Sequence, residues 1–488
     1  MSQSPTKATN PPPHPPGLYT LFFTEMWERC SYYGMRGLLV LFMKATVEKQ
    51  GLEFSIPMAG AIYGLYTAAV YLAAMPGGWV ADRLIGAQRA VLFGGVLIAG
   101  GQFTLAIPRT DTFFLGLLLV VLGTGLLKPN ISAIVGKLYP EGGARRDAGF
   151  TIFYMGINIG SFVGPMICGP LGEQINWRLG FAAAGVGMIG GLTQFLLMRG
   201  RLKGAGAKPE VATVSRGDWN LLFGALAGLV VLVALIWSGA VPFNPLKVAN
   251  GAKWVIVAIA VFTFLRLFFL SDLTTVEKKC IGVVAVLFVA AVTFFAGLEL
   301  AGSSLNIFAE QYTNRMLGSY EMPASWFQAI NPLFVVLLGP VAAGLWLALS
   351  KRGRDLSLGM KFGSGLVLLA VGYVVIALGA QRARAGPVWP LWLLLMYLLH
   401  TMGELCVSPV GLSSITKLAP ARMVGQIMGL WFMATALGNL MAGLIGGEST
   451  DAKQMEHQFW WIAIVAAGIA ILLMFLARPM RRWMAGIE

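Results

Sequence analysis

Charged residues are scarce in this chain of 488 residues. They make up 12% of it, and hydrophobic residues make up 57%. Soluble domains carry about 25% charged residues, so the composition excludes an ordinary soluble domain. The apolar residues form long runs. In the strands of a membrane β-barrel, apolar and polar residues would alternate instead. The composition therefore predicts an all-α membrane protein with many spans.

Cysteine and histidine are also few, with 4 and 3 residues. The cysteines lie in or beside apolar segments and lack the spacing of metal ligands, so we interpret them as packing residues. No motif places a nucleophile beside a general base. An enzyme that works within the membrane would need such a group or a metal. The sequence therefore disfavours an enzyme, and it predicts no metal and no other cofactor.

The 36 Lys and Arg residues outnumber the 22 Asp and Glu residues, and the formal net charge is +14. The basic residues concentrate in alternate loops, such as the loop with Arg83 and Arg89, and do not form one patch for nucleic acid. This distribution follows the positive-inside rule and predicts that both termini face the cytoplasm. Residues 1–17 are polar and Pro-rich and lack the apolar core of a signal peptide, which predicts a cytoplasmic tail.

Fourteen apolar stretches are long enough to cross a bilayer as helices. They cover approximately residues 18–44, 56–80, 88–107, 111–138, 147–172, 177–199, 218–238, 252–271, 279–311, 324–350, 359–380, 388–418, 422–447 and 457–478. A basic, Gly-rich stretch follows the sixth of them, at 200–217. We therefore expect a cytoplasmic linker there, six-helix bundles at 18–199 and 272–488, and an inserted helix hairpin at 218–271.

An internal repeat relates the two halves. The pattern Gly-x5-Pro-x7-Lys-Leu-x-Pro begins at Gly123 and again at Gly403. Since each copy ends the fourth span of its half, we expect two parallel six-helix repeats, as in the major facilitator architecture. The repeat also places Lys128 and Glu404 near mid-membrane, about one helical turn apart. We expect them to face each other across a central cavity, and a plain ion pair between the halves is the alternative.

The first apolar stretch carries charges that are costly inside a membrane. Its polar residues recur with the period of one helical face. They are Glu25, Glu28, Arg29, Tyr32, Tyr33 and Arg36. One charge at the bilayer centre costs on the order of 2.5–3.5 kcal/mol. The charges of this span must therefore pair with each other or face a polar interior, a pattern that indicates a transport pathway.

Motifs spread over most of the chain point to one family. The first is Glu25-x-x-Glu28-Arg29, and the second is the stretch from Phe150 to Ser161. Further motifs begin at Gly125, Glu299, Phe327 and Glu404. Together they resemble the signatures of the proton-dependent oligopeptide transporters, a family of the major facilitator superfamily. The resemblance implies the major facilitator fold with 14 transmembrane helices and the transport of small peptides with protons.

Three positions depart from that family's pattern. Cys30 stands where an aromatic residue is common, Phe295 where many relatives have Trp, and Leu300 where Gln is frequent. These differences bear on the preference among peptide side chains. The second span also lacks the histidine of animal relatives, so the resemblance implies that carboxylates handle the proton in this chain.

A peptide with free termini needs a carboxylate for its ammonium, a cation for its carboxylate and amides for its backbone. We assign the ammonium to Glu404 and the peptide carboxylate to Arg36 and Lys128. Asn158 and Asn331 are the candidates for the backbone, and hydrogen bonding between helices is the alternative. The residues expected to line side-chain pockets are Tyr32, Tyr33, Tyr71 and Trp431. Packing between helices is the alternative for these aromatic residues.

Proton coupling is assigned to carboxylates that lie near cations. Glu25, Glu28 and Glu299 are the candidates, with Arg29 as a partner within the first helix. The resemblance implies that Arg36 and Glu299 form a salt bridge that closes the outer side. It also implies that Glu25, Glu28 and Arg29 communicate with Lys128. An ordinary i,i+4 pair is the alternative for Glu25 and Arg29.

Together with the family resemblance, the sequence predicts a proton-coupled symporter that brings di- and tripeptides into the cell by alternating access, in the inner membrane of a bacterium. We expect its partners to be the peptide, protons and membrane lipid, with no nucleic acid, and its working unit to be a monomer. A family member that carries nitrate or an amino-acid-like metabolite is the first alternative, although opposite charges in one cavity favour a zwitterion. A channel is a further alternative, but a channel would not need two repeats with opposed charges.

Overall fold

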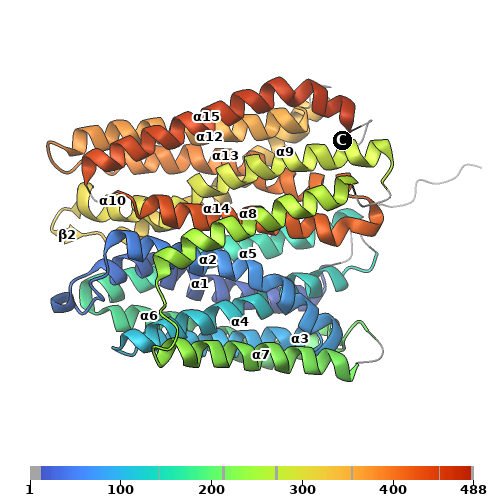
Figure 1. The fold of residues 1–488 in the computed structure, drawn as a ribbon, viewed down its shortest axis with the longest axis horizontal. Helices are drawn as coiled ribbons and strands as arrows, with labels where there is room; N and C mark the ends of the chain where they lie inside the picture. Colours follow the sequence, from blue (N-terminus) through green and yellow to red (C-terminus); the bar gives the residue numbers. More distant parts are fainter. Residues whose placement is uncertain are drawn as a thin grey trace, which may run out of the picture.

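The computed structural model describes residues 13–141, 143–211, 215–269, 273–352, 356–449 and 451–484. Most of the tail expected at 1–17, and residues 212–214 of the expected linker, lie outside the described residues. The long helices run side by side along one direction (Figure 1). The fold is therefore an all-α bundle, as the composition predicts.

The helices follow the predicted spans closely. They are α1 (Pro16–Lys44), α2 (Ile56–Val80), α3 (Ala87–Leu105), α4 (Thr110–Lys137), α5 (Gly143–Gly169), α6 (Trp177–Met198), α7 (Arg216–Trp237), α8 (Pro245–Phe269), α9 (Thr275–Leu298), α10 (Ser304–Tyr312), α11 (Ile330–Lys351), α12 (Leu358–Ala383), α13 (Leu391–Leu418), α14 (Val424–Gly446) and α15 (Ala452–Trp483). Two short strands, β1 (Met316–Leu317) and β2 (Tyr320–Glu321), pair antiparallel in a hairpin that the sequence did not predict.

The two ends of the bundle differ in charge. One end carries the loops after α2, α4 and α6, with Arg83, Arg145 and Arg201, and we call it the basic end. The other end carries α10 and the hairpin of β1 and β2, at the left of Figure 1, and we call it the hairpin end. The carbonyl of Pro13, near the start of the chain, accepts a hydrogen bond from Arg145, so this part of the chain lies at the basic end.

Twelve helical segments within the described residues are long and apolar enough to cross a membrane. Helices α1 and α3 are not among them, and for α1 the reason is the row of charges on its face. Helix α1 packs against α5 and α6 and is buried along most of its length, whereas α3 packs against α4 and α6 and leaves Phe93 and Val96 half-exposed. Neighbouring helices therefore replace lipid around α1, the span that carries the charges.

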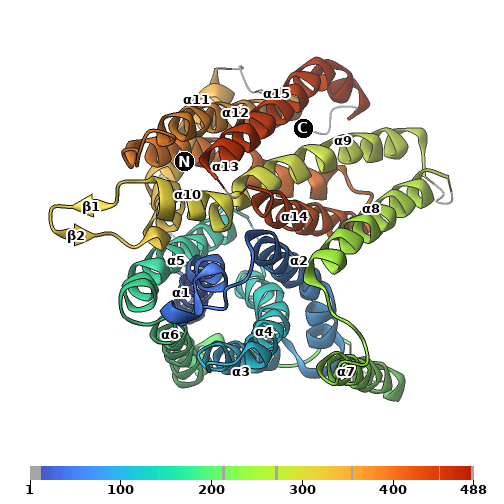
Figure 2. The same cartoon turned by 60° about the vertical axis from the view of Figure 1, so that its left-hand side comes forward.

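Helices far apart in the sequence pack in two groups. Figure 2 shows α1–α6 gathered in the lower part of the view, and α9 and α11–α15 in the upper part. In the second group α12 contacts α13 and α15, and α9 contacts α14. The most extensive contact between the groups joins α2 to α14. The bundle boundaries drawn from the sequence stay a prediction.

Small residues allow the close contact between α2 and α14. A Cβ atom at Gly64 would lie 2.8 Å from the carbonyl oxygen of Leu440 and 3.1 Å from the Cα atom of Gly443. Real Cβ atoms do not come so near to backbone atoms without a shift of the helices. Between membrane helices, where lipid offers no hydrophobic drive, such close backbone contact supplies the attraction.

Helices α7 and α8 lie beside the two groups but apart from each other: Figure 2 shows α8 next to α9 and α14, and α7 at the lower right. No residue of α7 is buried. Helix α8 packs on α2 and α14 and buries a few residues there, among them Ala249 and Ile256. The exposed apolar surface of α7 therefore faces the lipid.

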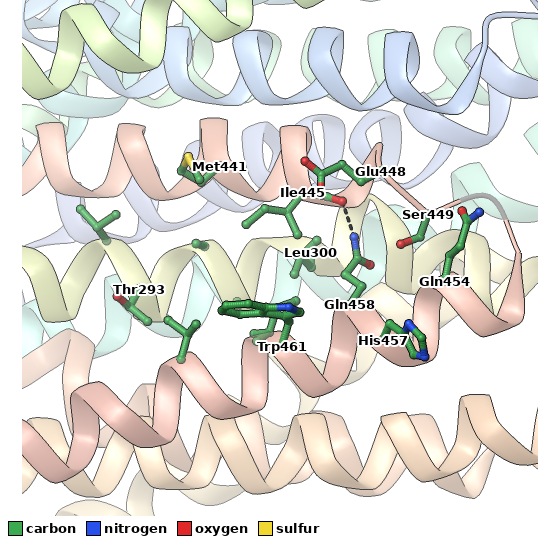
Figure 3. A pocket seen from close by; sticks show the side chains of 15 residues that line it. Thr293, Leu300, Met441, Ile445, Glu448, Ser449, Gln454, His457, Gln458 and Trp461 are labelled. Carbon is green, nitrogen blue, oxygen red and sulfur yellow. Dashed lines mark hydrogen bonds between the residues drawn. The ribbon is translucent and has the colours of Figure 1, made fainter.

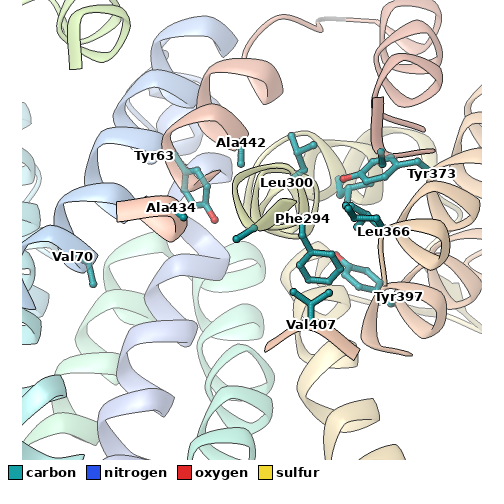
Figure 4. Close-up of a cluster of buried hydrophobic side chains, with 14 of the residues drawn as sticks. Tyr63, Val70, Phe294, Leu300, Leu366, Tyr373, Tyr397, Val407, Ala434 and Ala442 are labelled. Atoms are coloured by element: carbon teal, nitrogen blue, oxygen red, sulfur yellow. The ribbon is translucent and has the colours of Figure 1, made fainter. Parts of the chain in front are cut away.

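Helix α9 is held by buried apolar side chains from α12 and α13 (Figure 4). Phe294 lies among Leu366, Tyr397 and Val407 in this cluster. The Tyr373 hydroxyl donates a hydrogen bond to the Gly297 carbonyl at 2.5 Å. Just beyond this point the chain leaves α9 and forms a 3₁₀ turn, η5 (Glu299–Gly302), before α10 begins. The sequence predicted one continuous span here. The structure interrupts it with η5, and Glu299 is the first residue after α9 ends.

Candidate functional site

A cavity of about 180 Å³ lies between the two groups of helices. Side chains from α1, α5, η5, α11 and α13 line it. The predicted site residues among them are Tyr33, Arg36, Asn158, Glu299, Asn331 and Glu404. Residues from five separate segments of the chain thus meet around one polar space.

Glu404 presents a carboxylate to this cavity from α13. Its Oε2 accepts a hydrogen bond from Nδ2 of Asn331 at 2.9 Å, and the same amide donates to Oγ1 of Thr401 at 3.0 Å. Among the ion pairs of the described residues, none within 4.0 Å includes Glu404. A half-buried carboxylate held by one neutral donor is a favourable site for a cationic group, because a charge taken from water is stabilised by pairing.

Arg36 presents a guanidinium to the same cavity from α1. It forms a salt bridge with Glu299 through Nη2, and its Nε donates to the Tyr63 hydroxyl at 2.8 Å. The guanidinium also lies over the rings of Tyr33 and Tyr63, 5.4 and 5.7 Å from their centroids. The salt bridge that the family resemblance implied is therefore present, and it joins α1 to η5 across the two groups of helices.

Further contacts join the two groups at the hairpin end. Lys44 at the end of α1 forms an ion pair with Glu310 of α10. Glu173 lies in η3 (Pro170–Ile175) and accepts hydrogen bonds from the backbone N–H groups of Ala324 and Ser325, at 2.7 and 3.0 Å. These two residues begin η6 (Ala324–Ala329), which leads into α11. The hairpin end is thus closed by several polar contacts besides Arg36 and Glu299.

Sequence reasoning missed these closing residues. Glu173 is an isolated acid near the end of a span, and its partners are backbone groups that show no signal in the sequence. Asn306 donates to the carbonyl of Gly37 at 2.9 Å, which also joins α10 to α1. The one available signal was the position of Lys44 and Glu310, opposite charges that each lie near the hairpin end of a span.

The cavity opens toward the basic end. Tyr154 lines the cavity on α5, about one turn nearer the basic end than Asn158. It remains 43% exposed, whereas Arg36, on the side of the hairpin end, is 6% exposed. This difference in exposure describes a conformation that is closed at the hairpin end and accessible from the basic end.

The acids of α1 form a second charged cluster, nearer the basic end. Arg29 Nε lies 3.2 Å from Oε1 of Glu25, and Arg29 also forms an ion pair with Glu28. The exposed fractions of Glu25, Glu28 and Arg29 are 2%, 0% and 4%. A buried set of two acids and one arginine carries a net negative charge, which favours a further cation or a proton nearby.

Lys128 of α4 supplies a cation close to this cluster. It interacts electrostatically with Glu25, Glu28 and Arg29. Its ammonium also lies 4.1 Å from the ring centroid of Tyr71, a cation–π contact. The communication that the resemblance implies between Lys128 and the charges of the first helix stays a prediction.

Lys128 and Glu404 are not brought into contact. The ion pairs of the described residues do not join them, and of the two only Glu404 lines the cavity of about 180 Å³. The repeat gave the depth of these residues along their helices. It does not give the rotation of each helix about its own axis, which decides where a side chain points.

Three of the predicted pocket aromatics pack beside the cavity and do not line it. Tyr32 stacks on Tyr66 with centroids 6.2 Å apart, and Lys128 lies over Tyr71. Trp431 is 6% exposed and packs edge-on against Phe295, with centroids 5.9 Å apart. Phe295, a departure from the family pattern, therefore keeps an aromatic contact at its position.

Comparison with known proteins identifies the class to which this cavity belongs. Residues 88–462 match the family model described as the POT family, so the chain belongs to that family. The family is one of membrane transporters of the major facilitator type, and the chain is a multi-pass membrane transporter and not an enzyme.

The relatives cover almost the whole chain. Peptide transporter YePEPT of Yersinia enterocolitica is 42% identical over 96% of this chain and 95% of its own length. The di-/tripeptide transporter of Lactococcus lactis subsp. cremoris is 37% identical over 97% of both chains. These matches include the first helix, which precedes the region matched by the family model.

Solved structures share the fold. A peptide transporter POT in complex with sulfate superposes with a TM-score of 0.91, at 38% identity, over 97% of this chain and 96% of that chain. A glutamate-to-glutamine mutant of peptide transporter POT in complex with alafosfalin gives a TM-score of 0.90, at 38% identity.

Proposed function

We propose that this transporter brings di- and tripeptides into the cell together with protons. The observation that carries the proposal is the pair of opposite charges in one cavity, the Glu404 carboxylate and the Arg36 guanidinium. A peptide with free termini carries the complementary charges at its two ends. The names of the relatives, a peptide transporter and a di-/tripeptide transporter, support the same substrate class.

The peptide is held by groups of both halves. Its ammonium binds Glu404, whose carboxylate is already oriented by Asn331. Its carboxylate binds Arg36, whose planar guanidinium suits a bidentate contact. Asn158 lies in the same cavity, and its amide is the candidate for the peptide backbone. Lys128, which does not line this cavity, stays close to the acids of α1 and adds positive charge on the side of the basic end.

The size of the cavity bears on the range of peptides. Its volume of about 180 Å³ is small. Ligand pockets usually measure about 300–1,000 Å³, so peptides with large side chains require the cavity to widen. Helix α13 includes Pro409, and α11 includes Pro340, which weaken the helices that would move.

The carboxylate of Glu299 and the carboxylate of the peptide compete for the same arginine. In the closed hairpin end Arg36 is paired with Glu299. A proton on Glu299 neutralises the carboxylate and releases the guanidinium, which then binds the peptide carboxylate and lets the hairpin end open. Loss of the proton restores the salt bridge. The cluster of Glu25, Glu28 and Arg29 offers a second place for a proton on the route toward the basic end.

The orientation follows from the loops. The basic end faces the cytoplasm by the positive-inside rule, with both termini there, in the inner membrane of a bacterium. Alternating access then exchanges the conformation described above, which is accessible from the basic end, for one that is open at the hairpin end. The transporter works as a monomer, needs no cofactor, and uses the proton as its only coupling ion.

Uptake of radiolabelled dialanine into liposomes tests this function. We expect accumulation when the outside is more acidic than the lumen, and only equilibration when the gradient is absent or a protonophore is added. N-acetylated dialanine, which lacks the ammonium, should compete weakly. Equal uptake with and without the gradient would refute proton coupling, and efficient competition by the acetylated peptide would refute the assigned binding mode.

A further inference from the structure

A second, larger cavity opens on the side of the bundle between α9, α14 and α15 (Figure 3). Its volume is about 570 Å³, and it shares no lining residue with the central cavity. We call it the lateral groove. It lies near the hairpin end, because α14 ends and α15 begins beside it.

The lateral groove changes from polar to apolar along its length. Its mouth at the hairpin end is lined by Glu448, Ser449, Gln454, His457 and Gln458. Deeper in the membrane its walls are apolar and include Val292, Met441, Ile462 and Val465. Trp461 lies between the two zones and is 68% exposed. A tryptophan that contacts polar groups on one side and apolar groups on the other is typical of the membrane depth at which lipid headgroups lie.

The mouth of the groove holds hydrogen-bond acceptors that lack partners. Gln458 is 9% exposed, and its amide nitrogen donates to the carbonyl of Ile445, the bond drawn in Figure 3. Its Oε1 has no hydrogen-bond partner among the described residues. A buried acceptor without a donor costs about 1–3 kcal/mol, so this oxygen favours a ligand that brings a donor.

Glu448 adds a negative charge at the same mouth. The ion pairs found among the described residues do not include it, whereas Glu456 on α15 is already paired with Arg384. A carboxylate and an amide oxygen are both acceptors, and a primary ammonium offers three N–H donors and a positive charge. A quaternary ammonium has the charge but no N–H donor.

We propose that the lateral groove binds a phospholipid with a primary ammonium headgroup, such as phosphatidylethanolamine. The ammonium binds Glu448 and Oε1 of Gln458, and one acyl chain lies along the apolar wall past Trp461. His457 at the mouth supplies a donor for the phosphate. The groove is thus a lipid site separate from the central cavity, and Leu300 in its wall directly follows Glu299.

Native mass spectrometry of the delipidated protein tests the proposal. The probes are phosphatidylethanolamine, phosphatidylcholine and phosphatidylglycerol with identical acyl chains. We expect phosphatidylethanolamine to bind about tenfold more tightly than phosphatidylcholine, because a hydrogen bond to a charged group stabilises by about 1.5–3 kcal/mol. Equal binding of these two lipids would overturn the proposal, and tighter binding of phosphatidylglycerol would assign the groove to an anionic headgroup.

Matched variants separate the groove from the rest of the membrane surface. Glu448→Gln should reduce the preference for phosphatidylethanolamine to within about twofold, whereas Glu48→Gln, an exposed acid in the loop after α1 at the same end, should keep it. Trp461→Ala should weaken both zwitterionic lipids. Trp254→Ala on α8, where the tryptophan is 67% exposed, should change neither.

The peptide affinity of the Glu448→Gln variant distinguishes a failure of the lipid site from a failure of the proposed transport site. It should stay within about twofold of the wild-type value, because the groove and the central cavity share no lining residue. Loss of the lipid preference in Glu48→Gln as well, or its retention in Glu448→Gln, would refute the assignment even if peptide transport is confirmed.

Discussion

The salt bridge between Arg36 and Glu299 offers a direct test of what holds the hairpin end closed. Its side chains are only 7% and 12% exposed. Glu299→Gln removes the negative charge but keeps the size of the side chain and an acceptor. Arg36 also keeps its hydrogen bond to Tyr63. We expect the hairpin end of this variant to open far more often than that of the wild-type chain.

The expected size of the effect follows from burial. Removing one partner of a buried ion pair costs about 3–5 kcal/mol, and we take about 3 kcal/mol because glutamine still accepts a hydrogen bond. Since about 1.4 kcal/mol is a factor of ten in an equilibrium constant, the ratio of closed to open molecules falls roughly 100-fold. The pair of Lys44 and Glu310 is the matched control, because the Glu310 side chain is 31% exposed. Exposed pairs contribute about 0–1 kcal/mol, so Glu310→Gln should shift the equilibrium by about fivefold at most.

Labelling of a single cysteine measures the opening. Ser325→Cys, in a chain whose 4 native cysteines are replaced, sets a thiol at a position that is 0% exposed. The position lies beside Gly37 at the contact of η6 with α1, so a membrane-impermeant maleimide reaches it only when the hairpin end opens. Labelling should be about 100-fold faster with Glu299→Gln and at most about fivefold faster with Glu310→Gln. Equal rates in the two variants would refute the reasoning, provided that both elute as monodisperse protein.

Three further variants test the assigned roles. Glu404→Gln should weaken dialanine binding by about 10–100-fold, since the ammonium loses a charged partner, and should weaken binding of the N-acetylated peptide much less in a competition assay; equal losses would exclude an ammonium contact. Lys128→Ala leaves the two acids of α1 with Arg29 but without the second cation from α4, so gradient-driven accumulation should be lost, and accumulation at the wild-type level would exclude a role in coupling. In the double variant Glu25→Gln and Glu28→Gln, counterflow should persist while driven uptake is abolished, because exchange needs no net proton movement. Driven uptake that survives in that variant would show that a proton on Glu299 is sufficient for coupling.

Several features of this protein were determined by local sequence. Hydropathy over about 20 residues located the helices, because a span must satisfy its backbone and present apolar side chains to lipid. The helical period alone placed Glu25, Glu28 and Arg29 on one face, and the i,i+4 ion pair of Glu25 with Arg29 follows from that spacing, whereas the ion pair of Arg29 with its neighbour Glu28 does not. The salt bridge of Arg36 with Glu299 joins distant segments, and it could be expected only through the family motifs.

Other features were decided by how the helices pack. The contact of Gly64 with α14, and similar contacts elsewhere, set the rotation and separation of each helix, which no periodicity reports. That rotation brings Glu404 to the cavity, keeps Lys128 with the acids of α1, and turns Trp431 onto Phe295. Hydropathy and spacing describe one helix at a time, whereas a cavity is formed by side chains from several. The sequence by itself therefore determined the spans and the charged face of the first helix, and the tertiary structure decided which of those charges meet.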